Sequence, residues 1–220
     1  AKRRNVPYLL SAVGTTTIEE IALIAGDNAW FQLYIPGQEY ISFELLKRAK
    51  DAGYKNLVVT IDIPEPSRRL RDLRNDFTMP FKITPKIIWD IARKPNWVFA
   101  TLANGTPKFV NFVPYMKELA DGQNLNAAQA LQVSPNLCEK LMRRIRDAWD
   151  SNMILKGILT PNSAKAAERI GADGIIVSNH GGRQSDSIPS SIEALPFVKE
   201  AVSDKMTLLL DSGIRNGMDI

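Results

Sequence analysis

A histidine and an arginine that could act on one small molecule stand close together in residues 178–184, Ser-Asn-His-Gly-Gly-Arg-Gln. His180 is the only histidine of the chain, and Arg183 follows two glycines that permit a turn with positive φ. A neutral imidazole can take a proton near neutral pH, and a guanidinium binds a carboxylate through two parallel hydrogen bonds. The pair therefore indicates chemistry on a small organic acid.

The apolar run at 174–177, Gly-Ile-Ile-Val, leads directly into this segment and predicts a buried strand. Side chains alternate along a strand, so a strand continuing to His180 would point Ser178 and His180 to one side. A lone histidine at a strand end is more often a structural residue than a base. On these residues alone, both interpretations stay open.

Five further apolar runs predict strands that alternate with helices, which is the pattern of a parallel α/β protein. The runs lie at 8–13, 30–35, 56–62, 153–158 and 207–211. Helices are predicted from the Thr17 capping box, at 43–51, from Thr84, from Ser134 to Trp149, from Thr160 to Ile170, and at 191–202. Ligands of parallel barrels collect at the carboxyl ends of the strands, so polar residues there become candidates for a site.

Such polar residues recur at or near the ends of the strands: Ser11, Gln32, Tyr34, Thr60, Asp62, Lys156, Ser178 and Asp211. Singly, each has an ordinary structural explanation, but recurrence at six successive strand ends favours a shared site. Lys156 lies within an apolar run, so its ammonium must be buried, paired or extended to solvent. Asp62 could be a turn residue, or could accept a hydrogen bond from the His180 ring and fix its tautomer.

Composition bounds the class of protein. The chain has 220 residues, 45% apolar and 24% charged, which is ordinary for a globular protein with one sizeable core. It contains no apolar run of about 18 residues and no signal-peptide pattern, so no membrane-spanning segment is expected. A single cysteine, Cys138, excludes an intrachain disulfide, and with one histidine it argues against a metal site. The arginines behind the net charge of +4 fall in motifs, which favours a site for small anionic ligands over binding of nucleic acid or anionic lipid.

The string at 178–184 closely resembles the active-site signature of the FMN-dependent α-hydroxy-acid dehydrogenases and oxidases, the family of glycolate oxidase, L-lactate dehydrogenase, mandelate dehydrogenase and flavocytochrome b2. The resemblance runs from about Val6 to the last residue. It implies a TIM (β/α)8 barrel that binds FMN and oxidises an L-2-hydroxy acid, such as lactate, mandelate or glycolate, to the 2-keto acid. Only about strands two to seven of the eight are found, so we expect residues 1–220 to form one partial barrel. We expect a fragment, or part of a nicked enzyme, that binds FMN poorly alone.

The resemblance also implies roles by position. His180 would be the catalytic base, Asp62 its partner and Tyr34 a hydrogen-bonding contact of the substrate. Arg183 and Arg69 would hold the substrate carboxylate. The implied cofactor contacts are Ser11, Gln32, Thr60, Lys156 and Ser178 at the flavin ring, with Asp211, Gly213 and Arg215 at the ribityl chain and phosphate. Lys156 would also stabilise negative charge on the reduced ring. Ser212 replaces the first glycine of the family's Asp-Gly-Gly-Ile-Arg segment, and we expect the Gly213 turn to remain intact.

Apart from Arg69, the stretch at 67–133 has no assigned role. Its part at 81–99 mixes bulky apolar residues with cations, which suits either a lid over the barrel mouth or contact with an anionic membrane surface. The lid is favoured because long barrel loops usually cover the site, although some membrane-associated members of the family carry their membrane segment here. We expect a cytoplasmic homo-oligomer, with peripheral contact to the cytoplasmic membrane face as an open alternative.

Other functions are also compatible with the pattern. The electron acceptor could be oxygen, a quinone or a cytochrome. The chain could also be another flavin- or phosphate-binding barrel enzyme, or an inactive fragment. The other flavin- or phosphate-binding barrel enzyme is disfavoured because His180, Arg183, Arg69 and Tyr34 together fit a hydroxy acid.

Overall fold

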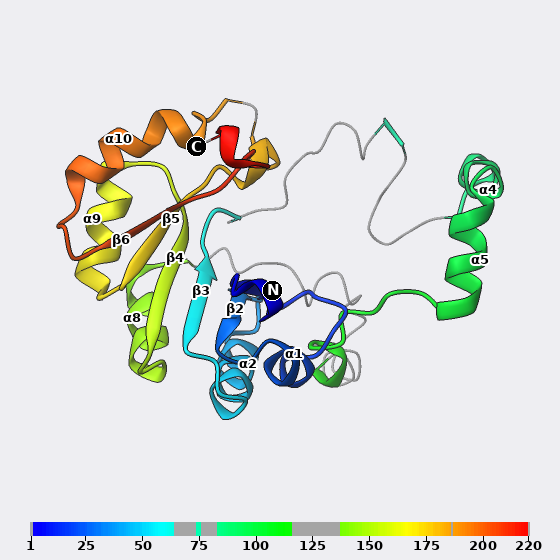
Figure 1. Ribbon diagram of the computed structural model, residues 1–220, viewed down its shortest axis with the longest axis horizontal. Helices are drawn as coiled ribbons and strands as arrows, with labels where there is room; N and C mark the ends of the chain where they lie inside the picture. Colours follow the sequence, from blue (N-terminus) through cyan, green and yellow to red (C-terminus); the bar gives the residue numbers. More distant parts are fainter. Residues whose placement is uncertain (1, 64–73, 76–82, 116–136, 186, 220) are drawn as a thin grey trace.

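Six parallel strands form one sheet in sequence order, each paired with its neighbours along the chain (Figure 1). The computed structural model describes residues 2–63, 74–75, 83–115, 137–185 and 187–219. The strands are β1 (Tyr8–Ser11), β2 (Ala29–Tyr34), β3 (Asn56–Thr60), β4 (Asn152–Ile158), β5 (Gly174–Val177) and β6 (Thr207–Leu210). Sequential order with parallel pairing is the topology of a (β/α) barrel. The predicted fold class, a partial TIM barrel, is confirmed.

Helices cover the outer side of this sheet (Figure 1). They are α1 (Ile18–Ala25), α2 (Glu39–Asp51), α8 (Glu139–Ala148), α9 (Pro161–Ile170) and α10 (Ser191–Ala201). Short 3-10 segments are η1 (Lys2–Arg4), η2 (Gly26–Asn28), η3 (His180–Gly182) and η4 (Gly217–Asp219). Thr17 caps α1 in a reciprocal capping box with Glu20, as the sequence predicts, and Thr160 caps α9.

The sheet buries two different faces because its side chains alternate. Phe31, Leu57 and Leu155 belong to the main core between sheet and helices. Val58, Ile154 and Ile176 form a second cluster on the inner face, with Trp30 and Leu209 packed against it.

Each residue of this inner cluster is followed two positions later by a predicted site residue. The pairs are Trp30 and Gln32, Val58 and Thr60, Ile154 and Lys156, Ile176 and Ser178, and Leu209 and Asp211. The strand period therefore carries the polar residues to the inner face, above an apolar floor.

Several predicted boundaries differ from the structure. β5 ends at Val177, so the argument that strand alternation aligns Ser178 with His180 is wrong. His180 instead begins the 3-10 segment η3 with a φ of 58°. β3 ends at Thr60 and α2 begins at Glu39, before the predicted position 43. The predicted start of α8 at Ser134 lies outside the described residues.

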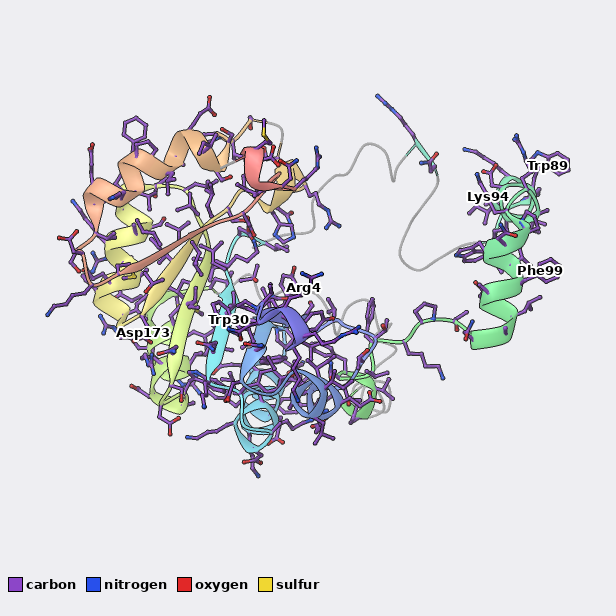
Figure 2. The ribbon with its side chains drawn as sticks, in the orientation of Figure 1. Arg4, Trp30, Trp89, Lys94, Phe99 and Asp173 are labelled. Atoms are coloured by element: carbon purple, nitrogen blue, oxygen red, sulfur yellow. The ribbon has the colours of Figure 1, made fainter. Side chains whose placement is uncertain are left out.

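Two further helices, α4 (Pro85–Ala92) and α5 (Pro95–Asn104), project away from the sheet. We call residues 83–105 the arm (Figure 1). Thr84 caps α4 as predicted, whereas α5 was not predicted. Figure 2 shows Trp89, Lys94 and Phe99 on the arm, far from Trp30 of the sheet. Within the described part of the chain, no helix is both long and apolar enough to cross a bilayer.

Asn111, which follows the arm in the sequence, holds the chain next to α1 through hydrogen bonds. The Asn111 side chain is fully buried. Its Oδ1 accepts from the backbone N–H of Ile18 at 3.0 Å, and its Nδ2 donates to the carbonyl of Thr16 at 3.2 Å. The arm is therefore connected to a fixed point next to the loop that follows β1.

Candidate active site

The His180 ring is held by Asp62. The ring Nδ1 lies 3.1 Å from Oδ1 and 3.2 Å from Oδ2 of the carboxylate, and the two side chains are only 10% and 11% exposed. A carboxylate accepts hydrogen bonds, so we assign the proton of the neutral ring to Nδ1. Nε2 is then the ring atom that can take a proton.

The turn that carries His180 has an unusual backbone. His180, Gly181 and Gly182 have φ values of 58°, 68° and 69°. Four successive backbone N–H groups donate to side-chain oxygens: Asn179 N to Ser212 Oγ at 3.3 Å, His180 N to Ser178 Oγ at 3.1 Å, Gly181 N to Ser212 Oγ at 3.1 Å, and Gly182 N to Asn179 Oδ1 at 3.1 Å. A non-glycine residue in the left-handed region costs about 1–2 kcal/mol, and these bonds offset that strain.

Gly157 makes room for Asp62, a role that was not predicted from the sequence. The β4–β5 register shifts between Lys156 and Ile158, and Gly157 has a φ of 103°. A Cβ at Gly157 would lie 2.5 Å from Cβ and 2.7 Å from Cγ of Asp62. A glycine inside an apolar strand run was the available signal, since such glycines mark bulges and close approaches.

Lys156 turns inward to a carboxylate and a hydroxyl. Its Nζ donates to Ser178 Oγ at 2.7 Å and forms an ion pair with Asp211, and the Lys156 side chain is 13% exposed. Ser212 Oγ donates to Asp211 Oδ1 at 2.9 Å. Burial opposes ionisation of Asp211, but hydrogen bonds from Lys156 and Ser178 outweigh it and hold the pKa of Asp211 below its usual value. This network therefore ties together the ends of β4, β5 and β6.

A second network crosses β1, β2 and β3. Ser11 Oγ donates to Gln32 Oε1 at 2.7 Å, and Gln32 Nε2 donates to Thr60 Oγ1 at 2.8 Å. Both Gln32 and Thr60 are buried. The two hydroxyls fix the orientation of the amide on the inner face.

The remaining predicted residues are placed less tightly. The Tyr34 and His180 ring centroids are 6.5 Å apart. Arg183 is exposed one residue after η3, and its guanidinium has no ion-pair partner among the described residues. Arg215 is exposed beyond β6, after Gly213 with its φ of 98°. Arg69 lies outside the described residues.

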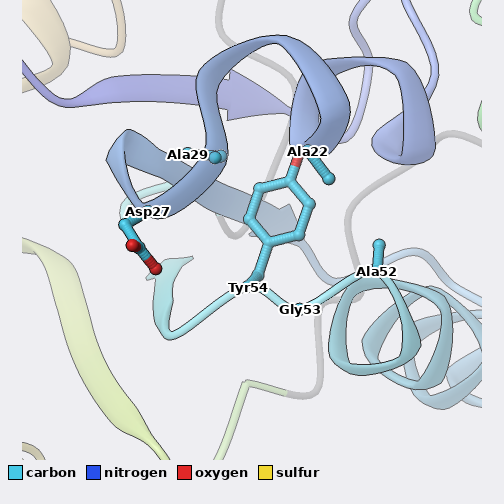
Figure 3. A pocket seen from close by; sticks show the side chains of 7 residues that line it. Ala22, Asp27, Ala29, Ala52, Gly53 and Tyr54 are labelled. Atoms are coloured by element: carbon cyan, nitrogen blue, oxygen red, sulfur yellow. The ribbon is translucent and has the colours of Figure 1, made fainter. Parts of the chain in front are cut away.

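A hollow of about 210 Å³ lies at the other end of the sheet, between α1 and the end of α2 (Figure 3). Its polar groups already have partners. Asp27 Oδ1 accepts from Lys55 Nζ at 2.8 Å, and the Tyr54 hydroxyl donates to the carbonyl of Ile18 at 2.9 Å. Burial raises the pKa of Tyr54 well above its usual value. The carboxyl ends of the strands are therefore the better candidate site.

Comparisons with known proteins identify the family of this chain. The sequence profile of the family described as FMN-dependent dehydrogenase matches residues 1–220. An L-lactate dehydrogenase of Caulobacter vibrioides (strain NA1000 / CB15N) is 37% identical over 100% of this chain and 57% of its own length. An L-lactate dehydrogenase of Vibrio cholerae serotype O1 (strain M66-2) is 38% identical over 100% of this chain and 58% of its own.

Solved structures show the same fold. A monotopic membrane protein, (S)-mandelate dehydrogenase, superposes with a TM-score of 0.82 at 31% identity, covering 97% of this chain and 56% of that one. A mandelate oxidase superposes with a TM-score of 0.74 at 35% identity, covering 100% of this chain and 53% of that one. The chain thus spans little more than half the length of the relatives it matches.

Proposed function

Because this chain belongs to the FMN-dependent dehydrogenase family, we propose that the protein oxidises an L-2-hydroxy acid to the corresponding 2-keto acid. The observation that carries the proposal is the buried contact between His180 Nδ1 and Asp62, which leaves Nε2 as the proton acceptor. Lys156 and the hydroxyl and amide groups of the inner face lie at the same strand ends. A base beside a polar, cationic surface suits removal of a proton from an anionic substrate.

The inner-face residues fit a flavin. Hydroxyl and amide groups of Ser11, Gln32, Thr60 and Ser178 would contact the polar edge of the ring, and Lys156 supplies a cation that is already oriented. Among the described residues other than its two chain neighbours, none has an atom within 4 Å of a Cβ built at Gly213, so a phosphate could approach the backbone there. Asp211, Gly213 and Arg215 are the proposed contacts of the ribityl chain and phosphate. FMN, when bound, would accept the two electrons that leave the hydroxyl-bearing carbon.

The protein residues have separate roles in this proposal. Arg183 and Arg69 bind the substrate carboxylate, and Tyr34 forms a hydrogen bond with the substrate. His180 takes the proton at Nε2, and the resulting imidazolium keeps its Nδ1–H bond to Asp62. The carboxylate stabilises that positive charge, as it does in other histidine–aspartate pairs.

Substitution of His180 by glutamine tests the proposed base. In protein saturated with added FMN, we expect flavin to remain bound in the variant and the reduction of flavin by substrate to slow by about two to four orders of magnitude, the usual effect of losing a general base. Anaerobic stopped-flow absorbance with lactate, glycolate and mandelate measures this rate and ranks the substrates. Lys199→Gln, on the exposed outside of α10, is the control. An unchanged rate in His180→Gln would refute the assigned role.

We also propose that the arm contacts a membrane surface. Several large apolar side chains of the arm are more than half exposed: Ile88, Trp89, Trp97, Phe99 and Leu102. Lys86, Arg93 and Lys94 are exposed beside them. Exposed aromatic side chains next to cations suit an anionic lipid surface, and one structural relative is described as a monotopic membrane protein. The position of the arm away from the sheet supports this role over a lid (Figure 1).

Co-sedimentation with vesicles distinguishes the membrane from other partners. We expect binding to anionic vesicles that weakens with salt and with Phe99→Ser, because part of the attraction is electrostatic. Phe197→Ser on α10 is a matched control, since Phe197 is 63% exposed and Phe99 is 70% exposed. Equal loss in both variants, or no binding by the unaltered protein, would contradict the proposal.

A further inference from the structure

Ser212 occupies a backbone conformation that suits glycine. Its φ is 79°, one of three positive values among the described non-glycine residues. Gly213 beside it has a φ of 98°. At Ser212 the resembled family segment has glycine, which would adopt this φ without strain. A serine here therefore destabilises the turn unless its hydroxyl forms compensating contacts.

The hydroxyl of Ser212 forms three such contacts. It accepts from the backbone N–H of Asn179 at 3.3 Å and of Gly181 at 3.1 Å, and it donates to Asp211 Oδ1 at 2.9 Å. Asn179 and Gly181 flank His180 in the sequence. One side chain after β6 thus holds both neighbours of the histidine in the turn after β5.

The same hydroxyl connects two functional groups that otherwise belong to different strands. Asp211 pairs with Lys156 of β4, and His180 bonds to Asp62 after β3. Ser178 supplies a parallel link, because its Oγ accepts from both Lys156 Nζ and the N–H of His180. If the Ser212 hydroxyl were removed, the backbone N–H groups of Asn179 and Gly181 would lose their acceptor. Among the described residues, Ser178 would then be the one side chain outside the turn that still accepts a hydrogen bond from the backbone of residues 179–181.

We propose that Ser212 is a positioning residue for His180: it fixes the left-handed turn that holds the imidazole against Asp62, and it ties that turn to the Lys156–Asp211 pair. The inference rests on the proposed role of His180 as the base. Ser212 touches neither the imidazole nor Asp62 in any contact seen among the described residues, so it acts through the backbone.

Two substitutions separate positioning from simple stabilisation. Ser212→Ala removes the hydroxyl and keeps the backbone strain, whereas Ser212→Gly removes both. Ser212→Gly should therefore unfold at a higher temperature than Ser212→Ala, because glycine adopts positive φ without strain. A positioning role predicts the same effect on His180 in both variants, whatever their stability. Ser203→Gly, which removes a serine hydroxyl bonded to Glu168 elsewhere, is the matched control.

The readout is the imidazole nitrogen spectrum of the 220-residue chain labelled with 15N-histidine. All imidazole signals come from His180, because this chain has one histidine. We expect the Nδ1–H tautomer to dominate in the unaltered chain and in Ser203→Gly. In both Ser212 variants the ratio of Nδ1–H to Nε2–H should fall by roughly tenfold, since losing about 1.4 kcal/mol of hydrogen bonding changes an equilibrium by that factor. An unaltered tautomer ratio in either folded Ser212 variant overturns the proposal. A tautomer ratio that falls in proportion to the melting temperature across Ser212→Ala, Ser212→Gly and Ser203→Gly also overturns it, because it would reflect lost stability alone.

Kinetics of the flavin-loaded enzyme provide the second readout. Misplacing a catalytic group by about 1 Å can slow a reaction roughly a hundredfold, so we expect kcat to fall by about tenfold to a hundredfold at unchanged KM. A change in KM alone would contradict a role in placing the base. If the tautomer ratio changes but the unaltered enzyme oxidises no hydroxy acid, the proposed function fails while the structural link from Ser212 to His180 stands.

Discussion

Substituting Gly157 by alanine tests whether close packing places Asp62 against His180. The added Cβ would stand 2.5 Å from Cβ and 2.7 Å from Cγ of Asp62, and 3.0 Å from its backbone nitrogen. Non-bonded contacts of 2.5 and 2.7 Å to a Cβ atom are essentially never seen in folded proteins. To reach an ordinary contact of about 3.4 Å, Asp62 must move by roughly 0.9 Å. A displacement of that size can lengthen the 3.1 Å bond to His180 beyond hydrogen-bonding distance.

The expected loss of stability has two parts. Alanine at a φ of 103° carries backbone strain of about 1–3 kcal/mol, and overpacking adds about 1–3 kcal/mol. For a chain of this size, a sum near 4 kcal/mol lowers the melting temperature by roughly 8–16 °C. Gly53→Ala is the matched control, because Gly53 has a φ of 87° and, in the part of the chain that the structure describes, only its chain neighbours come within 4 Å of its Cβ position. It should show the strain alone.

Differential scanning calorimetry and the imidazole nitrogen spectrum together measure both effects. Gly157→Ala should melt below Gly53→Ala and should lose the Nδ1–H tautomer of His180, which Gly53→Ala should keep. Equal melting temperatures, or an unaltered histidine tautomer in Gly157→Ala, would show that Asp62 is not held by this contact.

Three further predictions concern Asp62, Asn111 and Asp211. Asp62→Asn should raise the Nε2–H tautomer of His180, because an amide can donate to Nδ1 where a carboxylate only accepts; an unchanged nitrogen spectrum would contradict the assigned bond. Asn111→Ala should lower the free energy of unfolding by about 1–3 kcal/mol, because it leaves the N–H of Ile18 buried without its acceptor. Urea titrations measure this, and a loss below about 0.5 kcal/mol would refute it. The pKa of Asp211 is lowered on folding, so its ionisation stabilises the fold above its ordinary pKa near 3.9, and this contribution disappears as pH falls through the lowered value. Asp211→Asn should therefore lose less stability than the unaltered chain on acidification below about pH 4, measured by thermal melts.

The strand ends could be predicted from sequence because the strand period is local. Gln32, Thr60 and Lys156 each lie two positions beyond an apolar residue on the inner face, and alternation alone places them there. Neighbouring parallel strands in sequence order then bring their ends to one edge. The partnership of Asp62 with His180 was implied by the family resemblance alone, because no local pattern connects these two residues.

The backbone details could not be predicted, because they arise from contacts between distant segments. The approach of Gly157 to Asp62 depends on the β3–β4 register, and the left-handed φ of His180 depends on the hydroxyls of Ser178 and Ser212, which follow β5 and β6. In the sequence, Ser212 is a minor departure from a glycine pattern. Its contribution comes from hydrogen bonds to the backbone of residues 179 and 181, which no local pattern indicates. Such bonds become visible only when β5 and β6 lie side by side.

The pairing of β3 with β4 is continuous, from Asn56 opposite Asn152 to Thr60 opposite Lys156, although the arm intervenes between the two strands. Closing a flexible connection costs only about 0.6 kcal/mol more for each doubling of its length. The sheet can therefore tolerate exchange of the arm for another segment, provided that Asn111 keeps its hydrogen bond to the backbone of Ile18 in α1. The proposed membrane contact of the arm and the proposed chemistry at the strand ends would then be free to diverge independently among relatives, because exchanging the arm would leave the residues at the strand ends unchanged.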